Sequence, residues 1–160
     1  MWLRKFAPVV ALVLAACNMT PAYGPGGTGT ALQGKVALIE PQDIDSFALN
    51  QRLSDRLGPV EAAKWKLDYR LTTAVVGQGI TPDDVTTRYS LNGTVDFALT
   101  DIATGAAVTQ GRVSSFTSYS ATGTTIATLS SERDAHERLM VMLADQIVTR
   151  LLATGPKPAP

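Results

Sequence analysis

The stretch WKLDYRLTTAVV, Trp65 to Val76, alternates apolar and polar side chains one by one. Successive side chains of a β-strand point to opposite faces, so this period of two predicts a strand with one face against a core and the other toward water. The apolar face carries Trp65, Leu67, Tyr69, Leu71, Thr73 and Val75, and the polar face carries Lys66, Asp68, Arg70 and Thr72. The stretch therefore predicts a sheet that is covered on one side.

Two further strands are predicted after this one. The first alternation ends in GQGITPDD, Gly77 to Asp84, which contains two glycines and a proline. Val85 to Leu99 form a second alternating run. Asp101 to Gly105 has the composition of a short hairpin loop, with a glycine available for a positive φ. The run from Ala106 to Tyr119 predicts a third strand, although its alternation breaks near Phe116 and leaves its register open.

A short strand and a helix are predicted ahead of these three strands. Leu32 to Ile39 is a β-rich run that ends before Pro41. The helix begins at one of three N-cap candidates and ends at Gly58, which precedes a proline. The candidate caps are Asp43, Asp45 and Ser46, and the buried face is Leu49, Leu53 and Leu57.

A long helix is predicted after the strands, from Ser131 to Ala153. It starts with a capping-box-like Ser131-x-x-Asp134 and carries a wide apolar stripe that calls for a core to cover. The stripe consists of Ala135, Leu139, Met142, Leu143, Ile147 and Leu151.

This order of elements, β-α-β-β-β-α, predicts the α+β class. We expect a two-layer sandwich in which a four-stranded mixed sheet carries two helices on one face. A chain of 160 residues has enough apolar sequence for one such domain, which we place at residues 32–153. Residues 154–160 contain three prolines and are expected to form a disordered tail.

The N-terminus has the pattern of a signal peptide, residues 1–16. Arg4 and Lys5 precede an apolar run that is too short to span a bilayer, and Ala16 ends a small-residue cleavage context. Leu-Ala-Ala-Cys resembles the bacterial lipobox, which predicts cleavage after Ala16 and acylation of Cys17, the only cysteine. Asn18 is not the Asp that retains enteric lipoproteins at the inner membrane, so we expect the outer membrane. An ordinary signal peptide with a chance cysteine is the alternative.

A glycine-rich string follows the cysteine. Gly24 to Gly29 matches the dinucleotide fingerprint G-x-G-x-x-G, but that motif works only between a strand and a helix N-terminus. Here it follows the lipidation site and precedes a predicted strand. We therefore expect residues 17–31 to form a lipidated flexible tether of roughly 20 Å span.

The residues that could perform catalysis are sparse. A nucleophile needs an activating base, and a zinc site needs about three convergent ligands. His136 is the only histidine and is predicted to be a solvated surface residue, while Asp83 and Asp84 have the pattern of turn formers. We therefore expect no enzyme activity, no metal and no cofactor.

Basic residues on the polar face of the sheet are the better candidates for a binding site. Lys and Arg total 14, as do Asp and Glu, so no global basic excess indicates nucleic acid. Lys66 and Arg70 share the polar face of one strand, Arg88 holds the same side of the next, and Arg112 is a candidate from the last. Such a stripe suits lipid phosphates or a polar channel wall. A plain solvated sheet face, partly neutralised by acidic neighbours, is the alternative.

The sequence resembles the alphaproteobacterial type of the lipopolysaccharide (LPS)-assembly lipoprotein family LptE. Members commonly begin with Cys, followed by Gly, an aromatic residue, a variable residue, Pro, Leu and Tyr. Cys17, Pro21, Tyr23 and Gly24 of CNMTPAYG agree with this start, and Asn18, Met19 and Ala22 depart from it. The order of elements is similar as well.

The resemblance implies a non-catalytic role in the Gram-negative cell envelope. Family members plug the lumen of the LptD β-barrel, assist its assembly and help to deliver LPS to the outer leaflet. Two alternatives stay open. One is a periplasm-facing lipoprotein that binds a small lipid or serves an envelope transport system. The other is a hydrolytic or cell-wall lipoprotein enzyme, which needs a pocket that gathers His136 with a carboxylate or a hydroxyl group.

Overall fold

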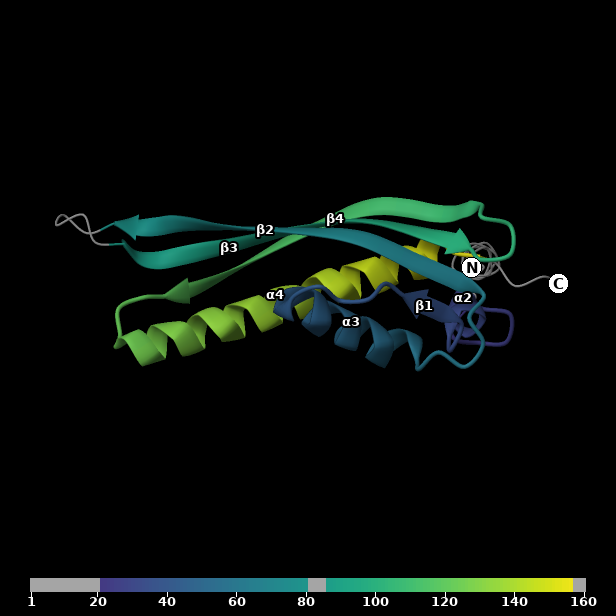
Figure 1. The fold of residues 1–160 in the computed structure, drawn as a ribbon, viewed down its shortest axis with the longest axis horizontal. Helices are drawn as coiled ribbons and strands as arrows, with labels where there is room; N and C mark the ends of the chain where they lie inside the picture. Colours follow the sequence, from purple (N-terminus) through teal and green to yellow (C-terminus); the bar gives the residue numbers. More distant parts are fainter. Residues whose placement is uncertain (1–20, 81–85, 157–160) are drawn as a thin grey trace, which may run out of the picture.

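The structure is a computed structural model that describes residues 21–80 and 86–156. It is an elongated sandwich in which a twisted sheet lies over one long helix and one shorter helix (Figure 1). The predicted α+β class and four-stranded mixed sheet are confirmed, and a short additional helix precedes the first strand. The elements are α2 (Thr28–Leu32), β1 (Val36–Leu38), α3 (Ile44–Leu57), β2 (Trp65–Ile80), β3 (Thr86–Asp101), β4 (Ala107–Ser120) and α4 (Thr125–Thr154).

The sheet has the strand order β1-β2-β3-β4. The short β1 is parallel to the start of β2, and β2, β3 and β4 are antiparallel to one another. Odd-numbered side chains of β3 from Leu91 to Leu99 are buried, as the alternation predicts for a strand with one covered face. Phe116 of β4 is 69% exposed because it lies on the uncovered face, which explains the break in the alternation at this residue.

A glycine at the centre of the sheet allows α4 to pack closely. A Cβ atom added at Gly93 would lie 2.9 Å from both Leu139 Cδ2 and Leu143 Cδ1. These two leucines are fully buried in the hydrophobic core, together with Val95. The helix therefore rests directly on the backbone of β3.

Replacing Gly93 by Val is expected to destabilise the fold by about 1–3 kcal/mol, because a side chain there overpacks the core. Asn92→Val is the matched control, since Asn92 is the preceding residue of β3 and its side chain is exposed. The free energy of unfolding in urea measures both effects. Equal stabilities of the two variants would contradict the packing described here.

Helix α3 begins with the predicted cap. The Asp43 side chain accepts a hydrogen bond from the Ser46 amide at 2.7 Å, and the Ser46 hydroxyl accepts one from the Asp43 amide at 2.9 Å. These bonds form a capping box, and the hydrogen bonds from Ser46 hold the pKa of Asp43 below its usual range. The predicted face of Leu49, Leu53 and Leu57 is buried, and Gly58 follows the helix with a φ of 79°.

Polar contacts fasten α3 to its neighbours. The Tyr69 hydroxyl of β2 lies 2.8 Å from Asn50 Oδ1, and burial raises the pKa of this phenol to about 12. Asp145 of α4 accepts hydrogen bonds from Arg52 and Arg56 at 3.0 to 3.1 Å. Both helices therefore share one layer, with α3 beside the middle and last turns of α4 (Figure 1).

Helix α4 begins at Thr125, ahead of the predicted Ser131. Thr124 is the N-cap, and its hydroxyl accepts a hydrogen bond from the Ala127 amide. The predicted start is wrong because the first turns carry exposed side chains, such as Ile126, and the buried stripe begins only at Ala135. No helix within residues 21–80 and 86–156 has the length and apolar character of a membrane span.

The glycine-rich segment is folded over its described part, which differs from the expected tether and from the expected strand start at Leu32. Residues 21–27 form turns, α2 follows, and Leu32 is fully buried at the end of α2. The Gly29 amide donates to the Ala22 carbonyl at 2.7 Å, and a Cβ atom at Gly27 would lie 2.2 Å from that same oxygen. The glycines therefore permit a tight turn rather than a loose coil. We call residues 21–32 the N-terminal clasp.

Candidate functional site

The outer face of the sheet, the one turned away from α3 and α4, brings together two of the four predicted cations. Asp96 of β3 lies opposite Arg70 of β2 on one side and opposite Arg112 of β4 on the other. Arg112 donates two hydrogen bonds to Asp96, from Nε to Oδ1 at 2.6 Å and from Nη2 to Oδ2 at 3.0 Å. We call Arg70, Asp96 and Arg112 the cation row.

The electrostatics of the cation row favour an anion. The hydrogen bonds from Arg112 hold the pKa of Asp96 below its usual range, and the charge of Arg70 acts in the same direction. Asp96 in turn raises the pKa of Arg112. Two exposed guanidinium groups thus flank one carboxylate, and Arg70 keeps an exposed side chain toward solvent. Planar guanidinium groups suit phosphate and carboxylate oxygens.

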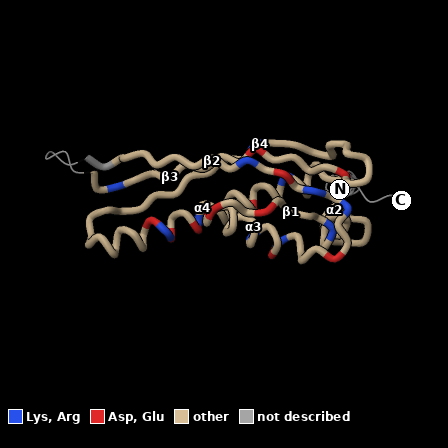
Figure 2. The backbone as a smooth tube through the Cα atoms, viewed as in Figure 1, with Lys and Arg blue, Asp and Glu red and all other residues tan. Residues whose placement is uncertain are grey.

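The other two predicted cations lie apart from this row. Lys66 is on the same face but forms an ion pair with Asp68 at 2.8 Å, about 13 Å along β2 from Arg70. Arg88 lies eight positions from Asp96 on β3, about 26 Å away, and its Nη2 donates to the Ser118 hydroxyl at 3.2 Å. Long parts of β2 and β3 carry no charge (Figure 2). The predicted basic stripe is therefore not continuous: Arg70 and Arg112 form one cluster, and Lys66 and Arg88 lie apart from it.

The sequence interpretation missed the aromatic residue of the outer face. Phe116 lies opposite Asn92, which in turn lies opposite Ala74, and this row is about 13 Å along the sheet from the cation row. Phe116 points outward because it lies four positions after Arg112 on β4, and side chains an even number of positions apart share one face of a strand. An exposed ring on the same sheet face as two guanidinium groups suits a ligand with both charged and apolar parts.

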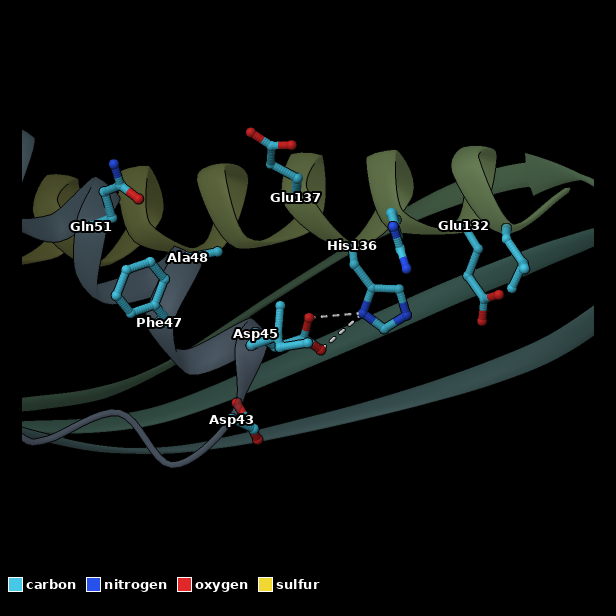
Figure 3. A pocket seen from close by; sticks show the side chains of 11 residues that line it. Asp43, Asp45, Phe47, Ala48, Gln51, Glu132, His136 and Glu137 are labelled. Atoms are coloured by element: carbon cyan, nitrogen blue, oxygen red, sulfur yellow. Dashed lines mark hydrogen bonds and ion pairs between the residues drawn. The ribbon is translucent and has the colours of Figure 1, made fainter. Parts of the chain in front are cut away.

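His136 occupies a different place from the predicted one. Its Nδ1 lies 2.8 and 2.9 Å from the two carboxylate oxygens of Asp45, and the two side chains are 27% and 19% exposed (Figure 3). The prediction of a solvated surface histidine is therefore wrong, because α3 brings Asp45 against α4. The contact joins the two helices.

The groove around His136 is lined by carboxylates, but no hydroxyl, thiol or amine nucleophile is among its described lining residues. An open groove of about 950 Å³ between α3 and α4 contains the histidine, and its lining lacks Ser, Thr, Cys and Lys. In the described part of the chain, no group of three or more His, Cys, Asp or Glu residues is arranged to hold a metal ion. Cys17, Ala16 and the pair Asp83 and Asp84 lie outside the described residues.

The fold is similar to that of several bacterial proteins described as lipoproteins. A chain from Caulobacter crescentus CB15 that is assigned as a lipoprotein has a similar structure, with a TM-score of 0.64, 21% identity and coverage of 81% of this chain and 96% of that one. Rare lipoprotein B from Shewanella oneidensis gives a TM-score of 0.57 at 16% identity, over 75% of this chain and 93% of its own. Lipoprotein B from Nitrosomonas europaea gives 0.53 at 12% identity, over 74% and 82%.

The family is defined by sequence. The model of the lipopolysaccharide-assembly family LptE matches residues 35–151, so the chain belongs to the LptE family. The predicted family is confirmed. Membership makes the protein a non-enzymatic component of LPS assembly. Comparison with curated protein sequences gives no match.

Proposed function

We propose that this protein is an outer-membrane lipoprotein, anchored through Cys17 on the periplasmic face, that plugs an LptD-like β-barrel and assists its assembly. In this role it helps to deliver LPS to the outer leaflet, with the outer sheet face contacting LPS or the barrel wall. The family match supports the role in LPS assembly. The fold of bacterial lipoproteins supports the lipid anchor.

The cation row is the observation that carries the proposed contact. Arg70 and Arg112 lie on a sheet face that neither α3 nor α4 covers, and Asp96 holds one of them in position. LPS is rich in phosphate, and charge-assisted hydrogen bonds from guanidinium groups to phosphate are strong and directional. Lys66 and Arg88 extend the positive face to either side and are proposed as weaker contacts.

A small-lipid carrier is the alternative function, and it needs an apolar cavity between the sheet and the helices. The close contact of Gly93 with Leu139 and Leu143 closes this space at the centre of the sandwich. Val95, two residues along β3 on the same face, is fully buried. This packing supports a plug rather than a carrier.

Purification of the tagged mature protein from outer membranes is expected to recover a large β-barrel protein as the main partner. The reason is that a plug is held on many sides by its barrel and should survive mild detergent. An untagged strain controls for carry-over of abundant barrels, and mass spectrometry identifies the partner. Recovery of inner-membrane transport components alone would contradict the plug and favour the auxiliary transport role.

A further inference from the structure

The groove between α3 and α4 exposes large apolar side chains that the core does not use. On α3, Ile44 is 88% exposed and Phe47 is 60% exposed, and on α4, Ile126 is 81% exposed and Leu129 is 51% exposed. Each pair has the spacing i, i+3, so its members share one face of their helix. Ile44, Phe47 and Leu129 line the groove, and Ile126 lies one helical turn before Leu129.

The groove results from the unequal lengths of the two helices. Helix α4 has 30 residues and α3 has 14, and the contacts of Asp145 and His136 place α3 beside the middle and later turns of α4. The first turns of α4 therefore extend past the beginning of α3 without a helix beside them (Figure 1). The helical layer has space for a further segment at this end.

The charges around the groove are mainly acidic. Asp43, Asp45, Glu132 and Glu137 line it, against Arg133 and His136 as the basic residues of the lining. In Figure 3, Asp45 and Glu132 lie to either side of the His136 ring, and Glu137 points away from it on the other side of α4. An acidic rim repels lipid phosphates and attracts Lys and Arg. The groove therefore favours a positively charged ligand, whereas the cation row favours an anion.

We propose that this groove docks an amphipathic helical segment of a partner protein, with Lys or Arg residues beside its apolar face. The apolar side chains of that segment pack against Ile44, Phe47 and Leu129, in the manner of a helix laid into a groove. Its basic residues lie near Glu132 and Glu137. A volume of about 950 Å³ is large enough for several side chains. The proposal is independent of the LPS contact.

Site-specific photo-crosslinking in cells that express the full chain tests the proposal. Benzoylphenylalanine replaces Phe47, whose ring it mimics, and in a control chain it replaces Ile102, which is 50% exposed in the turn between β3 and β4. We expect a protein adduct from position 47 and none of the same mass from position 102. Mass spectrometry should map the adduct to a segment in which apolar residues at helical spacing adjoin Lys or Arg.

Charge reversal of the rim makes the test specific. Glu132→Lys combined with Glu137→Lys should lower the yield of the adduct about fivefold or more, because each reversal replaces an attraction by a repulsion. Glu132→Gln with Glu137→Gln should give a smaller loss, and circular dichroism verifies that both variants fold. Four results would overturn the proposal: an adduct with lipid, an adduct with a second copy of this chain, no adduct at position 47, or a yield that charge reversal leaves unchanged.

Discussion

A Cys17→Ala variant is expected to leave the membrane fraction and to behave as a soluble protein. Two or three acyl chains, at about 0.8 kcal/mol for each buried methylene, hold a lipoprotein durably on a bilayer, whereas the described part of this chain has no helix long and apolar enough to replace them. Fractionation of envelopes in carbonate measures the effect. Globomycin, which blocks lipoprotein signal cleavage, should act on the wild type and not on the variant.

Thr20→Ala is the matched control, because it changes a nearby residue and keeps the thiol. Cys17 is the only cysteine of the chain, so both labels below report on this one site. Palmitate should label the wild type and the control but not Cys17→Ala, and maleimide should fail to react with the denatured wild type. Palmitate labelling that persists in Cys17→Ala, or a wild type with a free thiol, would refute the anchor.

The N-terminal clasp would shorten the reach of the proposed anchor at Cys17. A coil over residues 17–31 would let the folded body stand well away from the bilayer, but the chain is already folded from Pro21 onward. Only four peptide units separate Cys17 from Pro21, which is at most about 14 Å of extended chain. We therefore expect the clasp end of the sandwich to stay close to the membrane.

Replacing both Arg70 and Arg112 by Glu is expected to weaken the binding of LPS about tenfold or more. The double variant removes two guanidinium groups from one row and adds two carboxylates beside Asp96, so phosphates meet a negative patch. Stability should change little by comparison, because exposed ion pairs contribute only about 0–1 kcal/mol. Titration of immobilised LPS with the purified Cys17→Ala protein, together with thermal melting, separates the two effects.

Arg88→Glu is the matched control for this experiment. It makes the same charge change on the same face, but at about 26 Å from Asp96 along β3. We expect it to reduce binding less than either single change within the cation row. Dephosphorylated LPS should bind wild type and double variant alike. A double variant that binds intact LPS as tightly as the wild type does would exclude the cation row as the contact.

Local pattern was sufficient to predict the sheet and α3. The alternation in Trp65–Val76 and Val85–Leu99 predicted strands that the structure confirms. Trp65 and Leu67 of β2 and the odd-numbered residues of β3 from Leu91 to Leu99 are buried as predicted, whereas Val75 of β2, predicted on the same face, is 48% exposed. Asp43 was among the predicted caps, and the capping box confirms it. These features depend on residues a few positions apart, which the sequence shows directly.

Other predictions failed where distant segments meet. His136 was predicted to be solvated because its sequence neighbours are charged, but its partner Asp45 lies 91 residues away. The glycine string was predicted to be a flexible tether. This prediction failed because the close turns of this segment depend on which atoms approach its glycines, and the sequence does not show that. The start of α4 was predicted too late, because its first turns carry no buried stripe and are defined by the cap at Thr124.

The sequence by itself determined the class of the fold, the two faces of the sheet and the family, because periodicity and short motifs are written along the chain. The tertiary structure decided which charges act together: the strand register places Arg70 and Arg112 around Asp96 and leaves Arg88 apart. It also decided that α3 and α4 leave an acidic, apolar groove between them. The physical reason is that register and helix placement result from the packing of the whole core, which no local pattern encodes.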